Sequence, residues 1–368
     1  MDKVRVGLVG LGFGAEFIPI YQEHPDAELV AICQRDGSSL AALGRDFGID
    51  RRYGDYARML ADPDVDAVHI NTPIPLHAEQ SIAALEAGKH VACTVPMATS
   101  VEDCRRIVAA ARANDRRYMM METAVFTREF LHVQSLLRDG SLGRIQFLRG
   151  AHQQDMSGWP GYWEGLPPMH YATHAVGPLL ALAGSAAESV VCFGSGRIAP
   201  DLVARYGSPF AVETALVRLA DSTLAAEVTR SLFETARQYV ESFSVYADRR
   251  SFEWEQTEGE GPVIFEGEIA DRITVPDYAH LLPQEVRRFT TKGVYDDEHA
   301  HLSFTQGGGH GGSHPHLVHE FLRCILEERP ATVDEVTAAN WTLVGLCAHE
   351  SAMTDGSRVR LPEFAVPS

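Results

Sequence analysis

The chain has 368 residues, 45% hydrophobic and 22% charged, a composition typical of a folded protein long enough for two domains. Its formal net charge of −18 argues against nucleic acid and anionic membranes as partners, because both bind basic surfaces. No run of about 18 apolar residues occurs, and the first residues lack the pattern of a signal peptide. We therefore expect a cytoplasmic protein.

Strand and helix patterns alternate in the first third of the chain. Strands are predicted at 3–9, 27–33, 67–71, 90–94 and 118–122, with helices at 11–24, 40–47, 56–61, 76–87 and 101–114. This alternation predicts a parallel sheet covered by helices on both faces.

After a helix at 126–139 the pattern changes to longer alternating segments. Strands are predicted at 145–153, 189–194, 213–219, 224–230, 241–246 and 251–255, several of them separated by short turns. Such hairpins predict a mostly antiparallel sheet, and helices at 316–328 and 333–352 close the chain.

A glycine-rich turn joins the first strand to the first helix. The sequence GLGFGA at 10–15 fits the G-x-G-x-x-A pattern of a Rossmann domain. Gly10 permits the tight turn, Gly12 lets the backbone approach a pyrophosphate, and Ala15 lets helix and strand pack closely. The helix N-terminus then faces the phosphates, so we predict dinucleotide binding. To the same site we assign Phe13 and Gly14.

The end of the second strand bears on the choice between NAD and NADP. An acidic residue for the adenosine ribose is expected about 20 residues past the glycines. That position holds Gln34, with Arg35 beside it, which leaves NADP open. Asp36 could still bind the ribose, and we favour NAD.

The segments NTPIPLH at 71–77 and ALEAGKHV at 84–91 resemble the Gfo/Idh/MocA superfamily of oxidoreductases. The resemblance covers essentially the whole chain. It implies an α/β fold with an N-terminal Rossmann domain (1–123) and a C-terminal α/β domain (124–368) with a large, mostly antiparallel open sheet for substrate binding and oligomerisation. It also implies a homodimer or homotetramer, and it places along the cofactor Asn71, Thr72, Pro73 and His77.

The chain departs from that superfamily at the end of the next strand. Dehydrogenases of the superfamily carry Glu-Lys-Pro there, with the lysine near the reacting carbon, whereas this chain has Thr94-Val95-Pro96. Val95 cannot take the hydroxyl proton that leaves as an alcohol is oxidised. Either another residue does so or the chemistry differs. The resemblance assigns all three residues to the cofactor site.

A branch with valine at this position comprises NAD-dependent glycosidases that resemble α-N-acetylgalactosaminidase. The chain is similar to that branch at 94–98, 119–122, 149–152, 170–174 and 310–312. This resemblance implies that Glu122 lies in the cofactor site and that His310 belongs to the catalytic set.

Tyr171 and His174 are the candidate catalytic pair. They are three residues apart on a segment that we expect to begin a helix, so they would share one face, together with His170. A tyrosine with a pKa near 10 is a poor base at neutral pH, but a nearby cation would lower that pKa. The alternative is a hydrogen-bonded pair in the core.

Further substrate contacts are predicted in the Gly/Pro-rich loop after residue 151. Aromatic rings beside polar groups suit stacking on sugar faces, although a packed loop explains them equally well. The candidates are His152, Asp155, Trp159, Tyr162, Trp163 and, from the next segment, His170.

Six histidines fall between positions 299 and 319. A substrate-facing loop around the glycine run 307–312 is our preferred interpretation, ahead of a structural role or a zinc or manganese site. Their spacing fits no standard metal pattern, so we assign no metal. They are His299, His301, His310, His314, His316 and His319.

Three functions remain open at this stage. The first is a glycoside hydrolase that acts by transient oxidation at carbon 3 of a sugar, elimination and re-reduction, with Tyr171 as the base assisted by His174. The second is an NAD(P)-dependent sugar or cyclitol dehydrogenase. The third is a non-enzymatic sensor of NAD and sugar. In each case the ligand is a small carbohydrate or cyclitol.

Overall fold

A computed structural model of the chain describes residues 3–156, 161, 165–291 and 310–364. It divides into two compact units. Unit 1 contains Met1–Ala98, Glu102–Thr127 and Asp277–Ala338, and unit 2 contains Thr99–Val101, Arg128–Pro276 and Ala339–Ser368. This division differs from the expected domain boundary at 123/124 mainly because the segment 277–338 joins unit 1.

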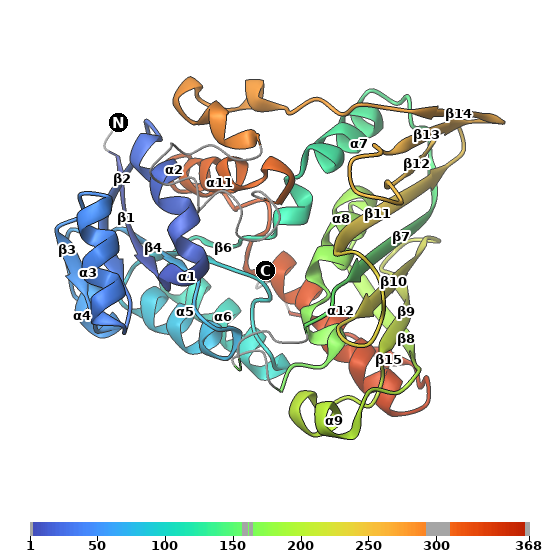
Figure 1. The fold of residues 1–368 in the computed structure, drawn as a ribbon, viewed down its shortest axis with the longest axis horizontal. Coiled ribbons are helices and arrows are strands. Elements are labelled where there is room, and N and C mark those ends of the chain that lie inside the picture. The colour runs from blue at the N-terminus through green and yellow to red at the C-terminus, as the bar shows by residue number, and fades with distance from the viewer. Residues whose placement is uncertain (1–2, 157–160, 162–164, 292–309, 365–368) are drawn as a thin grey trace. The chain divides into compact units, whose positions relative to one another are not determined.

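Unit 1 is built on a parallel sheet with the strand order β3-β2-β1-β4-β5-β6 (Figure 1). Its strands are β1 (Val4–Val9), β2 (Ala27–Cys33), β3 (Arg51–Tyr53), β4 (Ala67–Ile70), β5 (His90–Cys93) and β6 (Tyr118–Met120). The order reverses between β1 and β4, which pair through Val9 and Ile70. In such sheets ligands bind beyond the carboxyl ends of the strands at this switch point.

The helices of unit 1 follow the sequence pattern closely. In α5, for example, Ala78, Ile82 and Leu85 recur at helical spacing and are buried, and Gly88 follows its end with a φ of +76°. The predicted helix at 11–24 is instead three short segments. The helical segments are α1 (Leu11–Gly14), η1 (Ala15–Phe17), α2 (Ile18–Glu23), α3 (Gly37–Asp46), α4 (Tyr56–Leu60), η2 (Ile74–Leu76), α5 (His77–Glu86), α6 (Val101–Ala113), η3 (Thr123–Val125), η6 (Ala279–Leu281), η7 (Gln284–Thr290) and α11 (His314–Leu326).

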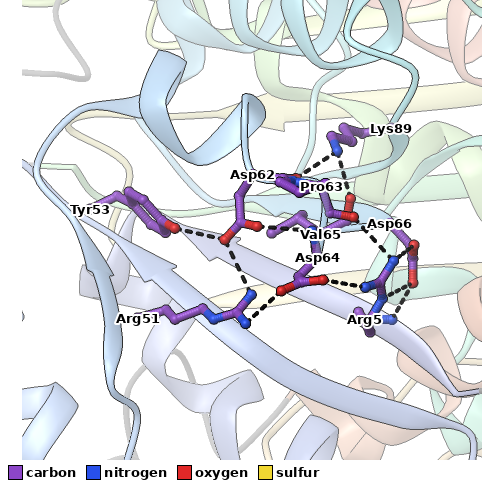
Figure 2. Close-up of polar contacts among 9 residues, drawn as sticks. All are labelled: Arg5, Arg51, Tyr53, Asp62, Pro63, Asp64, Val65, Asp66 and Lys89. Carbon is purple, nitrogen blue, oxygen red and sulfur yellow. Dashed lines mark hydrogen bonds and ion pairs between the residues drawn. The ribbon is translucent and has the colours of Figure 1, made fainter.

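A polar network ties the turn before β4 to the neighbouring strands (Figure 2). The guanidinium of Arg5 binds both carboxylate oxygens of Asp66, at 2.9 and 2.7 Å, and also reaches Asp64. Arg51 of β3 pairs with Asp64 at 2.6 Å, and the Lys89 ammonium donates to two carbonyl groups of the same turn. Because this turn precedes β4, the network lies at the amino-terminal ends of the strands, opposite the switch point. Its role is therefore structural.

Unit 2 is built on a second sheet with the order β14-β13-β12-β11-β7-β10-β9-β8-β15. Neighbouring strands are antiparallel, with the exception of the parallel pair β7 and β10. The expected large, mostly antiparallel sheet is therefore confirmed. Its elements are α7 (Arg128–Arg138), β7 (Ile145–Gln153), η5 (Pro168–Tyr171), α8 (Thr173–Ala183), β8 (Ala187–Ser195), α9 (Pro200–Tyr206), β9 (Val212–Leu219), β10 (Ala225–Ser231), β11 (Val240–Ala247), β12 (Ser251–Glu253), β13 (Val263–Glu266), β14 (Ile269–Arg272), α12 (Glu335–Met353) and β15 (Val359–Arg360).

Helix α8 packs on β7, β10 and β11, which Figure 1 shows beside it. The approach is close because β7 carries Gly150 at the contact, where a Cβ atom would lie 2.2 Å from the carbonyl oxygen of Ala175. The strand register places Glu241, His152 and Arg230 in one row across these three strands. Unit 2 therefore carries a row of polar side chains at the start of α8.

None of the helices in the described part of the chain combines the length and the hydropathy needed to cross a bilayer.

Candidate active site

The glycine-rich turn lies at the switch point of the unit 1 sheet. Gly10 has a φ of +80°, and a Cβ atom there would lie 2.6 Å from the carbonyl oxygen of Asn71. Gly12 is exposed, and a Cβ atom added to it would meet nothing within 4 Å. Gly14 contacts the Asn71 side chain, and Ala15 is buried. The turn thus packs tightly against β4 on one side and is open at Gly12, as the approach of a pyrophosphate requires.

The residues at the end of β2 have defined local roles. The side-chain amide oxygen of Gln34 accepts a hydrogen bond from the backbone N–H of Leu11 at 2.9 Å, which ties β2 to the glycine turn. Asp36 caps α3 by accepting from Ser39 N–H at 2.7 Å, while Arg35 is exposed. The structure therefore shows Gln34, and not Asp36, in contact with the turn.

His77 joins the two loops that follow β4 and β5. Its Nε2 lies 2.8 Å from the carbonyl oxygen of Thr72, and its Nδ1 lies 2.8 Å from that of Pro96. Thr94 adds a hydroxyl at 3.3 Å from Nε2, and Val95, which precedes a cis peptide bond to Pro96, is buried. His77 therefore joins the two loops through a contact with each of them.

The other expected cofactor residues lie at neighbouring strand ends. Pro73 precedes η2, and the hydroxyl of Thr72 donates to Gln80 at 2.6 Å. Glu122 is buried after β6 and accepts from the N–H of Ala124 at 3.0 Å, which caps η3. A glycine turn with an open Cβ position, a helix N-terminus and polar strand ends fit a dinucleotide in unit 1.

In unit 2, Tyr171 and His174 lie together at the start of α8. The Tyr171 hydroxyl is 3.2 Å from Nε2 of His174, although the segment is a short 3-10 helix followed by α8 and not one continuous helix. Glu241 of β11 lies 3.5 Å from the same Nε2 and 3.8 Å from Nε2 of His152. Tyr239 also hydrogen-bonds to Glu241. The two imidazole rings thus share one carboxylate beside the tyrosine.

Arg230 supplies a buried cation to this cluster. Its guanidinium donates to the backbone carbonyls of Tyr171 at 2.9 Å and His152 at 3.1 Å, and to the side chain of Gln154 at 3.0 Å. Its central carbon lies 5.7 Å from the centre of the Tyr171 ring. Burial lowers the pKa of Arg230 to about 10, so the side chain remains charged at neutral pH. A cation at this distance can stabilise negative charge that develops on Tyr171 during a proton transfer.

Sequence reasoning missed Arg230 and Glu241, but the strand pattern held a signal. Arg230 follows Ala226 and Val228 at the buried positions of β10, and Glu241 precedes Phe243 in the same way on β11. A charged residue at an inward position of a strand is uncommon unless it is paired, and it therefore points to a polar site.

His170 lies beside residues other than the expected His174. Its ring lies 5.3 Å from that of His349, which in turn pairs with the buried Glu213 at 3.0 Å. Burial lowers the pKa of His170 to about 4. His170 is thus a neutral, half-buried neighbour of Tyr171.

Residues 4–122 match the family described as "Oxidoreductase family, NAD-binding Rossmann fold". The expected resemblance to the Gfo/Idh/MocA oxidoreductases is confirmed for this segment. The nicotinamide cofactor expected from the glycine turn is confirmed by this match, and the chain is an NAD-dependent enzyme.

Similar proteins match either the first part of this chain or its whole length. An uncharacterized oxidoreductase from Rhizobium meliloti is 36% identical over 155 residues, which is 41% of this chain and 46% of that protein. A glycosyl hydrolase family 109 protein from Shewanella pealeana is 24% identical over 99% of this chain and 86% of its own. A levoglucosan dehydrogenase solved with NADH and levoglucosan has a TM-score of 0.79 at 22% identity, over 98% of this chain and all of that one, which shows a shared fold.

The structure places the remaining expected site residues only in part. Asp155 is exposed after β7, whereas Trp159, Tyr162 and Trp163 lie outside the described residues, as do His299 and His301. Within the described ranges, no group of three or more His, Cys, Asp or Glu side chains is arranged to hold a metal ion.

The described end of the glycine run is a left-handed turn directly before α11. His310, Gly311 and Gly312 have positive φ values, and residues 307–309 lie outside the described part. His310 packs against Phe13 and His314, with ring centres 5.8 and 5.2 Å away.

Proposed function

We propose that this oxidoreductase is a glycoside hydrolase that acts on a small carbohydrate and uses NAD as a recycled redox catalyst. The observation that carries the proposal is Tyr171, held between His174 and the buried cation Arg230. A tyrosine so placed can act as a base near neutral pH. The similarity to family 109 glycosyl hydrolases over 99% of the chain supports the same reading.

Bound NAD would supply transient oxidation of carbon 3 of the sugar, which acidifies the proton on carbon 2. Tyr171 removes that proton, and Arg230 stabilises the phenolate that receives it during the step. We assign the proton on Nε2 of His174, because Glu241, 3.5 Å from that nitrogen, can only accept a hydrogen bond. The single N–H is shared between the Glu241 carboxylate and the Tyr171 oxygen, which lies 3.2 Å from the same nitrogen.

Loss of the carbon 2 proton expels the aglycone from carbon 1 by elimination, and addition of water followed by re-reduction completes hydrolysis. Tyr171 returns its proton to carbon 2 as water adds. This route needs no pair of carboxylates on either side of the glycosidic bond. The proton released from the hydroxyl on carbon 3 must be held and returned within each cycle, and Val95 cannot hold it.

A sugar or cyclitol dehydrogenase is the second candidate. The shared fold with a levoglucosan dehydrogenase over 98% of the chain favours it. In that case the hydroxyl proton needs an acceptor other than Val95. For either function we propose NAD over NADP, because Gln34 holds the glycine turn while the exposed Arg35 has no other basic residue next to it in the sequence.

The test is turnover of nitrophenyl glycosides by Tyr171→Phe. We expect the rate to fall by about 100-fold or more, the scale of a lost acid–base group, with NAD affinity unchanged. Tyr246→Phe is the matched control, because this tyrosine lies further along β11 and its hydroxyl donates to Glu253 of β12. Release of nitrophenol without accumulation of NADH supports the hydrolase, whereas stoichiometric NADH from free sugars means a dehydrogenase. Unchanged turnover by Tyr171→Phe removes Tyr171 from the mechanism.

A further inference from the structure

Three side chains of unit 1 form a line behind the glycine turn, with one hydrogen bond between two histidines and a closely placed carboxylate at the buried end. Nδ1 of His310 lies 3.1 Å from Nε2 of His314, and Nδ1 of His314 lies 3.4 Å from a carboxylate oxygen of Glu16. Glu16 and His314 are each 1% exposed, whereas His310 is half-buried. The line therefore runs from a buried carboxylate to an imidazole that solvent can reach.

Aromatic rings pack against His314, the middle residue of this line. The His314 ring lies 4.6 Å from Phe17 and 5.6 Å from Phe13, and His310 also contacts Phe13. Phe13 directly follows Gly12, the open position of the glycine turn. The exposed end of the line thus lies beside the predicted phosphate-binding loop, within the same unit.

The backbone orients His310 before any ligand binds. His310, Gly311 and Gly312 have φ values of +45°, +63° and +83°. At Gly312 a Cβ atom would lie 2.3 Å from the carbonyl oxygen of Thr290, so glycine is required there. A non-glycine residue with positive φ is held in an unfavourable backbone conformation, and such residues gather at functional sites.

The three groups can take up one proton at the exposed end. With Glu16 ionised, His314 donates its Nδ1–H to Glu16 and accepts the Nδ1–H of His310 on its Nε2, so Nε2 of His310 is a base. A proton received there either stays on His310 as imidazolium or moves through both rings to Glu16. In both cases the line loses one negative charge and no net positive charge is buried.

Neighbouring groups are consistent with a neutral His314. Burial holds the pKa of His314 well below its ordinary value, and the nearby His310 and His69 act in the same direction. His69 is itself fully buried, which lowers its pKa to about 3, and it hydrogen-bonds to the hydroxyl of Tyr21 at 3.2 Å. These groups face the line from β4 and α2, and neither adds a charge at neutral pH.

We propose that Glu16, His314 and His310 form a proton relay that makes His310 an acid–base group on the cofactor side of the enzyme. When a substrate hydroxyl is oxidised, its carbon loses a hydride and its oxygen loses a proton. The relay accepts that proton at Nε2 of His310 and returns it on re-reduction, the task that Val95 cannot perform. The role of the relay in turnover rests on the proposed redox function, whereas the effect of Glu16 and His314 on the titration of His310 does not. Glu16 and His314 are positioning residues.

The first test follows the ring resonances of His310 by NMR in histidine-labelled protein, with no substrate present. Glu16→Gln removes the carboxylate charge and should lower the pH at which His310 titrates by about one unit. Glu320→Gln, which changes a carboxylate paired with Arg329 on α11, should leave that midpoint unchanged. An unchanged midpoint in Glu16→Gln would overturn the relay, whatever the enzyme's substrate. If Glu16→Gln does not fold, His314→Gln, which breaks the line at its centre, should lower the same midpoint.

The second test measures turnover against pH. His310→Gln should lower kcat by about 100-fold or more with NAD affinity unchanged. Glu16→Gln should lower kcat less, and it should move the acidic limb of the pH profile to lower pH by the same interval as the NMR midpoint. Equal loss at every pH would mean that Glu16 only supports the fold. If the NMR midpoint shifts but kcat and its pH profile do not change, the proposed redox role is rejected and the relay itself is not.

Discussion

Both ring nitrogens of His77 lie 2.8 Å from carbonyl oxygens, and a carbonyl oxygen can only accept a hydrogen bond. Both nitrogens must therefore carry protons, which makes His77 a buried imidazolium. Burial alone would lower its pKa, but the Cys93 side chain and the carbonyls of Pro96 and Thr72 outweigh burial and raise the pKa to about 8.

His77 should make stability depend on pH in the alkaline range. A pKa that folding raises contributes stability that is complete below the unfolded value near 6.5 and is lost as pH rises through about 8. The difference corresponds to about 2 kcal/mol. Urea unfolding at pH 6.5 and 8.5 should show this loss in the wild type and in His132→Gln, but not in His77→Gln. An equally steep loss in His77→Gln would mean that the ring is neutral in the folded protein.

Substitutions at Gly10 and Gly12 should separate an effect on packing from an effect on NAD binding. Gly12→Val adds atoms in open space, so we expect a change below about 1 kcal/mol in the free energy of unfolding and a loss of about 100-fold or more in NAD affinity. Gly10→Val meets the Asn71 carbonyl and should destabilise the fold itself. Calorimetric NAD titration and thermal unfolding measure the two effects, with Gly37→Val, also in open space, as the control. Normal NAD affinity in Gly12→Val would refute the assignment of the turn.

At the scale of elements, the unit 2 site depends on how closely α8 approaches β7. The contact at Gly150 allows a helix to rest on the sheet without an intervening side chain, and His174 precedes the Ala175 carbonyl that touches it. The distance between His174 and Glu241 is therefore set by a backbone contact, because strand β11 lies next to β7 in the same sheet.

Gly150→Ala should push the start of α8 away from the sheet. We expect a loss of about 1–3 kcal/mol in the free energy of unfolding, as for other overpacked contacts, together with lower turnover. Ala151→Ser alters the opposite face of the same strand and should change neither. Chemical denaturation and the glycoside assay check both effects. Full activity in Gly150→Ala would mean that α8 can shift without consequence.

At the scale of the whole molecule, one face of the unit 2 sheet carries exposed apolar side chains. Phe193 on β8 and Leu216 on β9 are each 57% exposed, and the register places them on the same face. The inward neighbours Cys192, Ala215 and Val217 are buried, so the apolar character of the outer face is not needed for the core.

We predict that this face joins copies of the chain into a homodimer or homotetramer. Light scattering after size-exclusion chromatography should give a multiple of the chain mass for the wild type and the single-chain mass for the double variant Phe193→Glu, Leu216→Glu. Met353→Glu, at an exposed apolar position of α12, is the control. A monomeric wild type would contradict the prediction.

Much of the local structure was predictable because it depends on residues a few positions apart. The strands at 27–33 and 145–153 have the predicted ends, and the ends of α5, α6 and α7 lie within two residues of their predicted positions. Alternation and helical spacing are readable from the sequence because they reflect burial of one face of each element. Short elements escaped this reading: β3 has three residues, two of them exposed arginines, and β15 has two.

The sequence by itself determined the Rossmann unit, the nicotinamide cofactor and the pair Tyr171 and His174, because each is written in a local motif. Only the tertiary structure decided what surrounds that pair. Arg230 and Glu241 reach it through the pairing of β10 and β11 with β7, and His314 reaches Glu16 from almost 300 positions away. Such contacts follow from strand order and from burial of apolar faces that meet late in the chain, and no local periodicity encodes either.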